Sequence, residues 1–146
     1  MELIVKHFSE LNTTELYEIL KTRAEIFVVE QNCPYQDLDD RDQNALHVFC
    51  WNDEGRVAAT LRVFMKEGEP GVAVIGRVVT LVHGTGLGGR ILHKAVELAR
   101  DYYKAKKINI HAQQYAIGYY AKEGFEVTSE PFLEDDIPHV EMARIL

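Results

Sequence analysis

Four glycines occur within six residues of a loop that follows an apolar, β-branched run. The run is Val78-Val79-Thr80-Leu81-Val82, and the loop is His83-Gly84-Thr85-Gly86-Leu87-Gly88-Gly89. A helical repeat of apolar residues follows from 91 to 99. Glycine lets the backbone adopt positive φ and approach a ligand closely, and the first turn of a helix adds unpaired N–H groups and a partial positive charge. The sequence therefore predicts that this unit of strand, loop and helix holds a phosphate or pyrophosphate group.

Two common phosphate-binding motifs fit this loop poorly. Residues 84–89 match G-x-G-x-x-G, but a dinucleotide site also expects an acidic residue roughly 20 residues further on, at the end of the next strand. The next predicted strand, Lys107-Ile108-Asn109-Ile110-His111, contains no acid. A P-loop needs Lys and then Ser or Thr after its last glycine, whereas Arg90-Ile91 stands there. A nicotinamide- or nucleotide-binding enzyme is therefore disfavoured, although it stays open as an alternative.

A third motif fits the loop better. Residues 83–88 (HGTGLG) resemble the Q/R-x-x-G-x-G/A loop of the GNAT N-acetyltransferases, which cradles the pyrophosphate of acetyl-CoA, with His83 where Gln or Arg is usual. Residues 113–125 are similar to the family's N-x-x-A-x-x-x-Y-x-x-x-G-F segment, with Gln113 in place of Asn and with Ala116, Tyr120, Gly124 and Phe125 in register. Four further segments resemble the ElaA-like branch of this family, and with them the resemblance spans nearly the whole chain. These segments are 23–31, 33–35, 111–113 and 132–142.

The resemblance implies that acetyl-CoA is the acetyl donor and that the loop and the preceding strand hold it. Backbone N–H groups from Thr80 to Val82 are the candidates for stabilising the oxyanion that develops during acyl transfer. The residues expected to contact the cofactor are Val79, Thr80, Leu81, Val82, His83, Gly84, Thr85, Gly86, Leu87, Gly88, Gly89, Gln113 and Tyr120.

The resemblance also implies that Tyr120 sits beside the coenzyme A sulfur and protonates the departing thiolate. A free thiol has a pKa near 8.5, so a thiolate is a fair leaving group, and a phenol acting as general acid would lower the barrier further. Its neighbour Tyr119 lies on a different helix face and is expected to pack. A general base must take the proton of the acceptor's ammonium group, and Glu30, His111, Glu134 or a chain of waters are the candidates. His111 ends a predicted strand, and an imidazole suits proton transfer near neutral pH.

The hydrophobic pattern predicts the elements that position these residues. A strand at 3–5 precedes a helix that begins with an Asn12–Glu15 capping box and ends near Gln31. Strands are expected at 45–51, 57–65 and 72–82, with a bulge or close backbone approach at Gly76. A helix at 86–104, a strand at 107–111, a helix at 114–123 and strands at 125–127 and 139–146 follow. Residues 34–44 are expected to form an acidic, solvated loop at the rim of a substrate cleft, and 130–138 an irregular stretch.

The predicted order, β-α-β-β-β-α-β-α-β-β, indicates an α/β (α+β) fold. We expect a single GNAT-like domain over residues 1–146, with a mixed, mainly antiparallel central sheet flanked by helices. The apolar segment 140–146 is either at a subunit interface or, as we expect, an inner strand. A homodimer is compatible with the sequence.

Composition narrows the classes of partner. The chain of 146 residues carries a formal net charge of −7. This charge disfavours a nucleic-acid partner and slightly favours a cationic acceptor. No apolar run is long enough for a membrane span and no signal-peptide pattern is present, so a cytoplasmic location is expected. No disulfide or zinc pattern is formed by Cys33, Cys50 and the scattered histidines, and no calcium pattern by the aspartates of residues 37–42. No metal is therefore expected.

The sequence therefore predicts an acetyl-CoA-dependent N-acetyltransferase. It would move the acetyl group to a primary amine, on a small molecule or a protein, by direct attack on the thioester. A non-catalytic sensor or interaction module that binds acyl-CoA is the main alternative, because His83 and Gln113 depart from the residues usual in the family.

Overall fold

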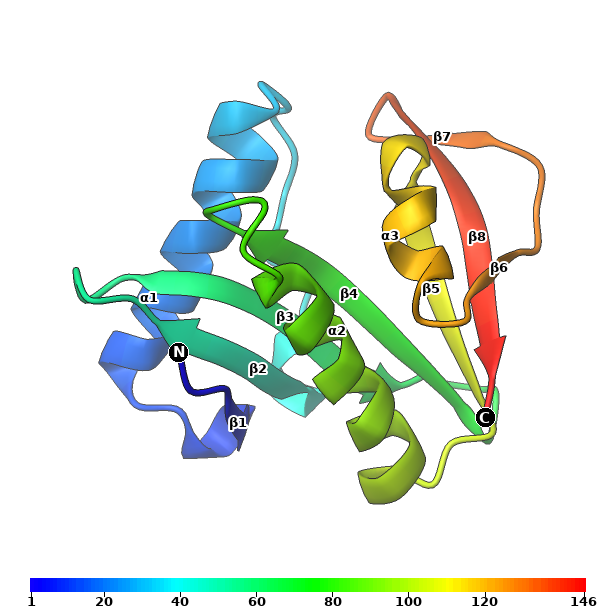
Figure 1. Cartoon of the computed structure of the whole chain (residues 1–146), viewed down its shortest axis with the longest axis horizontal. Coiled ribbons are helices and arrows are strands. Elements are labelled where there is room, and N and C mark those ends of the chain that lie inside the picture. Colours follow the sequence, from blue (N-terminus) through cyan, green and yellow to red (C-terminus); the bar gives the residue numbers. More distant parts are fainter.

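The computed structural model describes all 146 residues, and its centre is one mixed sheet of eight strands (Figure 1). The strand order is β1-β2-β3-β4-β5-β8-β6, and β7 also pairs with β8. Every pair is antiparallel except β4 with β5. The sheet confirms the predicted fold class. The strands are β1 (Ile4–His7), β2 (Leu46–Trp51), β3 (Val57–Met65), β4 (Val72–Thr80), β5 (Lys107–Gln113), β6 (Glu126–Val127), β7 (Phe132–Glu134) and β8 (Ile137–Ile145).

Three α-helices accompany the sheet: α1 (Thr13–Ala24), α2 (Leu87–Glu97) and α3 (Ile117–Ala121). The first two continue into π-helical turns at Glu25–Glu30 and Leu98–Tyr102, and short 3₁₀ turns lie at Phe8–Glu10, Asp42–Asn44 and Gln114–Ala116. The predicted capping box is confirmed. The side chain of Asn12 accepts the N–H of Glu15 at 2.8 Å, and the Glu15 carboxylate accepts the N–H of Asn12 at 2.9 Å. None of the helices combines the length and the apolar character needed to cross a membrane.

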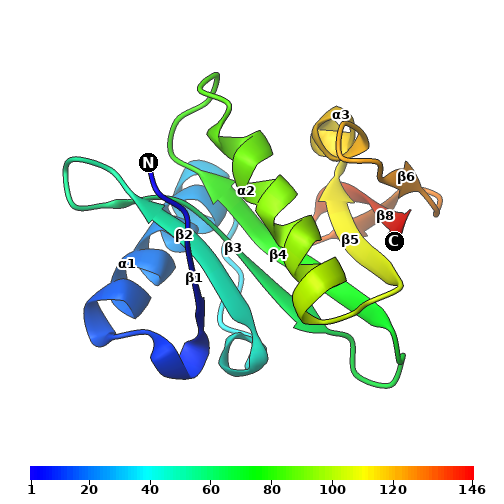
Figure 2. The ribbon, with the colours of Figure 1, turned by 60° about the horizontal axis from the view of Figure 1, so that its bottom comes forward.

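The helix α2 packs across one face of the sheet, and α1 lies on the other (Figures 1 and 2). The side of α2 that faces the sheet carries Ile91, Leu92, Ala95 and Val96, each at most 1% exposed. Burial of one large aliphatic side chain contributes roughly 1.5–3 kcal/mol, so this stripe alone fixes α2 firmly. The start of α2, and with it the glycine loop, is thereby held beside the end of β4.

The sheet divides between β4 and β5. These strands pair only through Val72–Val74 and Lys107–Asn109, and beyond that point they diverge in a V (Figure 1). Strands β1 to β4 form one arm of the V, and β5 to β8 form the other. The C-terminal ends of β4 and β5 therefore leave an open space between the two arms.

A bulge interrupts β4 within the open part of the V. Two residues of β4, Arg77 and Val78, face the single residue Leu61 of β3 where the register shifts. Arg77 has φ +53°, which residues other than glycine rarely adopt. The bulge follows directly after Gly76, where the sequence predicts an irregularity, and a bulge of this kind re-aims a side chain.

Two predicted boundaries are wrong. Residues 130–138 are not irregular, because β7 and the start of β8 form a hairpin there. Its turn is Asp135-Asp136, with φ of +51° and +61°. Such turns are normally signalled by Asn-Gly or Asp-Gly, so an Asp-Asp pair hid the hairpin. Strand β4 ends at Thr80, earlier than predicted. Strand β8 lies between β5 and β6, so the apolar C-terminal segment is the inner strand that we expected.

Candidate active site

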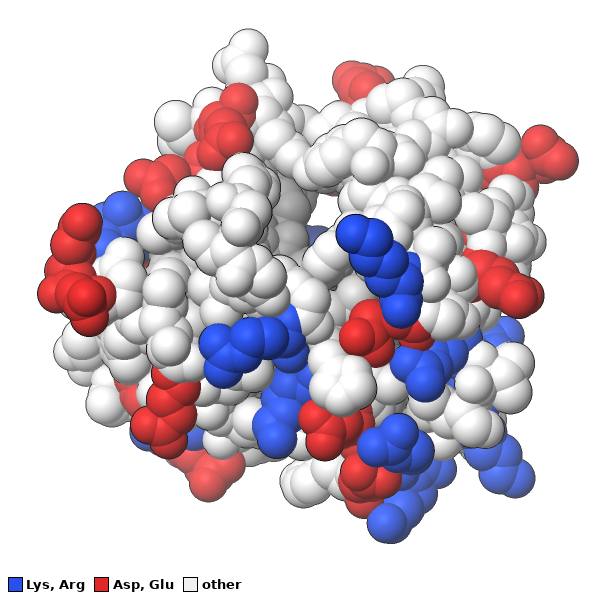
Figure 3. All heavy atoms as spheres, viewed as in Figure 1, with Lys and Arg blue, Asp and Glu red and all other residues white.

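A cavity of about 530 Å³ lies in the open part of the V. In the space-filling view it appears as a hollow between the two arms, with uncharged side chains around much of its mouth (Figure 3). The cavity brings together most of the predicted site residues. Those that line it are Val79, Thr80, Val82, His83, Gly84, Thr85, Gly86, Gly88, Gly89, His111, Gln113 and Tyr120.

The glycine loop and the start of α2 form one end of this cavity. Gly84 and Gly86 both have φ +79°, a conformation that would strain a residue with a side chain. Gly86 is the N-cap of α2 and has no side chain to cap the helix, and the only side-chain partner in the first turn is Thr85, whose Oγ1 accepts the N–H of Leu87 at 3.4 Å. The first N–H groups of the helix therefore lack an intrahelical partner. An uncapped helix start lined by glycine and facing a cavity suits a pyrophosphate such as that of an acyl-CoA.

Three of the predicted residues lie outside the cavity wall. Leu81 donates its backbone N–H to the carbonyl oxygen of Ala58 at 2.8 Å, and Leu87 is 4% exposed within the core. Glu30 is exposed at the end of the π turn and does not line the cavity. The structure thus does not bring Glu30 together with Tyr120 and His111.

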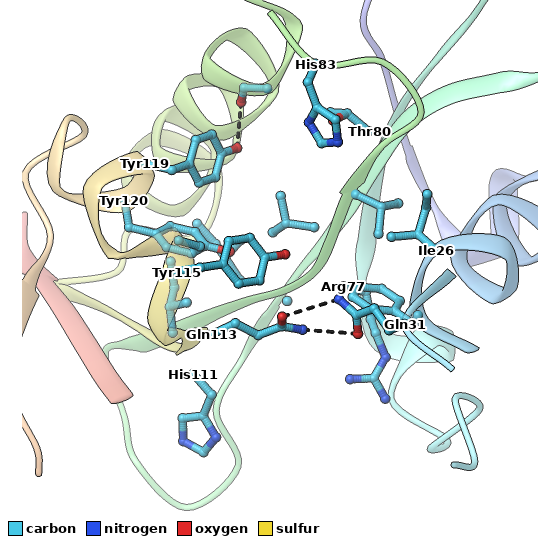
Figure 4. A pocket seen from close by; sticks show the side chains of 18 of the residues that line it. Ile26, Gln31, Arg77, Thr80, His83, His111, Gln113, Tyr115, Tyr119 and Tyr120 are labelled. Atoms are coloured by element: carbon cyan, nitrogen blue, oxygen red, sulfur yellow. Dashed lines mark hydrogen bonds between the residues drawn. The ribbon is translucent and has the colours of Figure 1, made fainter. Parts of the chain in front are cut away.

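Two adjacent tyrosines of α3 have different surroundings (Figure 4). Tyr120 is buried and lines the cavity, and its hydroxyl has no hydrogen-bond partner within the protein. Burial raises the pKa of Tyr120, so its phenol stays protonated at neutral pH. Tyr119 instead donates its hydroxyl hydrogen to the carbonyl oxygen of Gly88 at 2.6 Å. Tyr119 therefore fastens α3 to the start of α2, which confirms its expected packing role.

His111 is held by a carboxylate from the neighbouring hairpin. Its Nδ1 lies 3.0 Å from Oε1 of Glu134. An ionised carboxylate only accepts hydrogen bonds, so Nδ1 carries the hydrogen and a neutral His111 keeps its lone pair on Nε2. On the other side of the carboxylate, Nε2 of His139 lies 3.6 Å from Oε2. All three residues line the cavity, and the arrangement can present a base to a ligand there.

A pair of amides joins the two arms across the cavity (Figure 4). The side chains of Gln31 and Gln113 each donate one hydrogen bond to the other, with N–O distances of 3.3 Å. Cys33 provides a second link, since its Sγ lies 3.4 Å from the carbonyl oxygen of Asp135. Gln113, expected to contact the cofactor, therefore lines the cavity while it also bridges it.

The acidic loop 34–44 is exposed at most positions as expected, but Asp37 and Asp42 are buried and form ion pairs. Three arginines pair with three of its four aspartates at 2.6–3.0 Å, namely Arg23, Arg62 and Arg77 with Asp37, Asp39 and Asp42. Burial opposes the ionisation of Asp42, but hydrogen bonds and charges from Arg23 and Arg62 outweigh it and hold the pKa of Asp42 below its usual range. The loop does lie at the rim of the cavity as predicted, since Tyr35 lines it.

The side chains of the cavity that sequence reasoning missed include Gln31, Arg77, Tyr115 and His139. Arg77 had one available signal, because it is the only charge in the run from Val72 to Val82. Tyr115, which is 81% exposed, has no distinguishing pattern around it. No three His, Cys, Asp or Glu side chains gather as a metal site would require.

A split sheet with a glycine loop at the cleft is the architecture of acyl-CoA N-acyltransferases. The crystal structure of one from Pseudomonas aeruginosa matches this chain with a TM-score of 0.90 and 38% identity, covering 99% of both chains. The family model "Acetyltransferase (GNAT) domain" matches residues 13–146. The chain therefore belongs to the GNAT family of acetyltransferases, whose members transfer acyl groups from acyl-CoA.

Its relatives define the branch within that family. The chain is 36% identical over 143 residues to Protein ElaA of Escherichia coli (strain K12), covering 94% of this chain and 92% of ElaA. The crystal structure of Escherichia coli ElaA gives a TM-score of 0.91 at 33% identity, with 98% of both chains covered. UPF0039 protein Rv2851c of Mycobacterium tuberculosis is 42% identical over 141 residues, covering 92% of this chain and 87% of that protein. The predicted ElaA-like branch is thereby confirmed.

Proposed function

We propose that this protein transfers an acetyl group from acetyl-CoA to a primary amine, on a small molecule or a protein, by direct attack of the amine on the thioester. One observation carries the proposal: the uncapped helix start at Gly86 and the unpartnered phenol of Tyr120 line the same cavity of about 530 Å³. When bound, acetyl-CoA supplies an activated acyl group and a thiolate that can leave. The chain must then bind it, orient the amine and move protons.

Binding of the acetyl-CoA pyrophosphate is assigned to backbone groups rather than to side chains. The unpaired N–H groups at the start of α2 and the positive end of its dipole bind the pyrophosphate. A Cβ at Gly88 would lie 3.4 Å from the ring of Tyr119, so the backbone of this turn packs closely against α3. Thr80 on β4 and Gln113 on β5 line the cavity from its two arms, where they would flank the donor (Figure 4).

Tyr120 acts as the general acid. Its hydroxyl has no other partner, and its raised pKa keeps the proton in place until the sulfur departs. A thiolate with an ordinary pKa near 8.5 is protonated at neutral pH. Because Tyr120 is the weaker acid, the transfer of its proton to the sulfur is completed only as the phenolate regains a proton released by the acceptor's amine.

His111 is the base that the geometry favours among the three candidates. Glu134 fixes the imidazole with its basic Nε2 available, and Glu30 lies away from the cavity wall. The ammonium of the acceptor loses two protons in the reaction. One passes through His111 to solvent, and the other balances the proton that Tyr120 gives to the sulfur as the C–N bond forms and the C–S bond breaks.

The bridge between Gln31 and Gln113 favours one alternative, a sensor that binds acyl-CoA without transferring the acyl group. The bridge crosses the space through which an acceptor would approach. A sensor would bind acetyl-CoA and leave it intact.

Two assays with the same preparation separate these functions. Thermal unfolding is followed with acetyl-CoA, NAD or ATP, because only a ligand that binds the folded state raises the midpoint. Release of free thiol from acetyl-CoA is then measured with a panel of primary amines. A midpoint raised by acetyl-CoA together with amine-dependent thiol release supports the transferase. Binding without release with any amine favours the sensor, and a response to NAD or ATP alone refutes both. The homodimer stays a prediction, which light scattering would test.

A further inference from the structure

Arg77 is held in an unusual conformation by contacts on one side. Its left-handed backbone, with φ +53°, persists only where surrounding contacts impose it. Asp37 accepts a hydrogen bond from Nε at 2.8 Å, and the carbonyl oxygen of Asp37 accepts one from Nη2 at 3.0 Å. The ring of Tyr35 lies 5.7 Å from the guanidinium carbon. The bulge, the aspartate and the tyrosine together aim this guanidinium.

The remaining edge of the guanidinium is only partly occupied, because Nη2 also lies 3.5 Å from Oδ2 of Asp39. Nη1 of Arg77 has no hydrogen-bond partner within the protein, and 23% of the side chain is exposed. The other two arginines of the network, Arg23 and Arg62, are enclosed, with 2% and 4% of their side chains exposed. Arg77 lines the cavity, and a guanidinium presents its donors in a planar fork that matches a carboxylate.

The facing wall carries the opposite charge. Glu134 and Asp135 line the cavity from the hairpin of the other arm, and Asp135 takes part in no ion pair. In Figure 4 the guanidinium of Arg77 and the imidazole of His111 lie on opposite walls, and Tyr120 lies on the other side of the amide bridge. In the part of the cavity away from the glycine loop, one wall thus presents the free Nη1 donor of Arg77, and the facing wall carries carboxylates.

We propose that the acceptor is an amine that also carries a carboxylate, such as an amino acid, and that Arg77 binds this carboxylate. Its ammonium group then lies toward Glu134, where His111 can take a proton. An amine without a carboxylate leaves Nη1 of Arg77 unpaired once water is displaced, which is unfavourable. The inference rests on the proposed function, because it narrows the acceptor class of the same site.

The test uses pairs of acceptors that differ only in the carboxylate: leucine with leucinamide, and phenylalanine with phenylalaninamide. The ratio of kcat/KM for acid over amide is measured by thiol release in the wild type, Arg77→Gln and Arg77→Lys. The control is Arg41→Gln, because Arg41 is 61% exposed, lies 3.9 Å from Asp39 and does not line the cavity. We expect the ratio to fall tenfold or more in Arg77→Gln and to stay unchanged in the control. If Arg77 only anchors the loop, both acceptors lose activity together and the unchanged ratio overturns the proposal.

A binding measurement separates this proposal from the transferase itself. Titration calorimetry compares N-acetylleucine with N-acetylleucinamide on the protein saturated with coenzyme A. Tighter binding of N-acetylleucine than of N-acetylleucinamide by the wild type, with no such difference in Arg77→Gln, supports the proposal. This result would support it even if no amine is acetylated, in which case only the proposed transferase activity is refuted. Equal binding of the two compounds by the wild type overturns it. Should Arg77→Gln fail to fold, Arg77→Lys carries both comparisons, because it keeps the charge and loses the planar fork.

Discussion

The replacement of Tyr120 by phenylalanine removes one oxygen atom and tests the proposed acid directly. The hydroxyl makes no hydrogen bond within the protein, and the ring packs edge-on against Tyr119 and Phe125 with centroids 4.9 and 6.1 Å away. Phenylalanine preserves those contacts, so we expect stability to change by no more than about 0.5 kcal/mol.

Activity should respond far more strongly than stability. General acid catalysis typically contributes about 10²- to 10⁴-fold. A thiol with a pKa near 8.5 needs less assistance than a poorer leaving group, so the lower end applies. We therefore expect kcat to fall about 100-fold in Tyr120→Phe, which corresponds to about 2.7 kcal/mol in the barrier.

The neighbouring tyrosine provides the matched control. Tyr119→Phe loses the 2.6 Å hydrogen bond to the carbonyl of Gly88, which costs about 0.5–1.5 kcal/mol. For a domain of this size that lowers the unfolding midpoint by roughly 2–5 °C, while kcat stays within a few-fold of wild type. Tyr115→Phe, on the exposed tyrosine at the cavity, tests whether a second phenol supplies the proton.

The assay is thiol release at saturating acetyl-CoA and amine, with thermal unfolding of each variant alongside. Unchanged kcat in Tyr120→Phe would refute the assignment of the acid. An equal loss in Tyr119→Phe would show that the effect comes from the packing of α3 rather than from proton transfer. A loss confined to Tyr115→Phe would move the acid to that residue.

Three further predictions concern the base, the glycine loop and the buried charges. Glu134→Gln removes the carboxylate that orients the base, and we expect kcat/KM to fall about tenfold or more with a shifted acid limb of the pH–rate profile; an unshifted profile would argue against the pairing. Gly86→Ala strains a residue at φ +79°, so calorimetry should show weaker acetyl-CoA binding, whereas Gly118→Ala, where a Cβ meets nothing within 4 Å, should bind normally. The pKa of Asp42 is depressed in the folded state, whereas an unfolded Asp titrates near 3.9. The contribution of Asp42 to folding stability is therefore present in full above about pH 5 and is lost as the pH falls below about 4. Urea unfolding across this range should show the decline, and constant stability down to pH 3 would contradict it.

The features that the sequence predicted well depend on neighbouring residues. The helix start at Asn12, the stripe of α2 and the glycine loop are all defined within a few positions of the chain, so local patterns reveal them. The hairpin at Asp135-Asp136 was missed although it is local, because its turn lacks the glycine of the usual Asn-Gly or Asp-Gly signal, and aspartate adopts the positive φ instead.

The rest of the site depends on partners that are distant in sequence. Gln31 and Gln113 are 82 positions apart, and Arg77 reaches Asp37 across 40. Neither pairing has a spacing rule, since the folded sheet alone brings these side chains together. The ion pairs of the acidic loop were missed for the same reason: its arginine partners lie on α1, β3 and β4, and nothing within the loop indicates them.

The division between β4 and β5 also affects the backbone hydrogen bonding of both strands. Beyond Val74 and Asn109 the facing edges of the two strands have no ladder partner, so alternate peptide groups along each edge must be satisfied by water or by a guest molecule. In the free protein these amides should exchange their hydrogens with solvent far faster than amides deeper in the same strands. A ligand that carries its own peptide-like groups would form hydrogen bonds with both strand edges at once. The amides whose hydrogen exchange slows on binding would then show how far the ligand extends between the two strands.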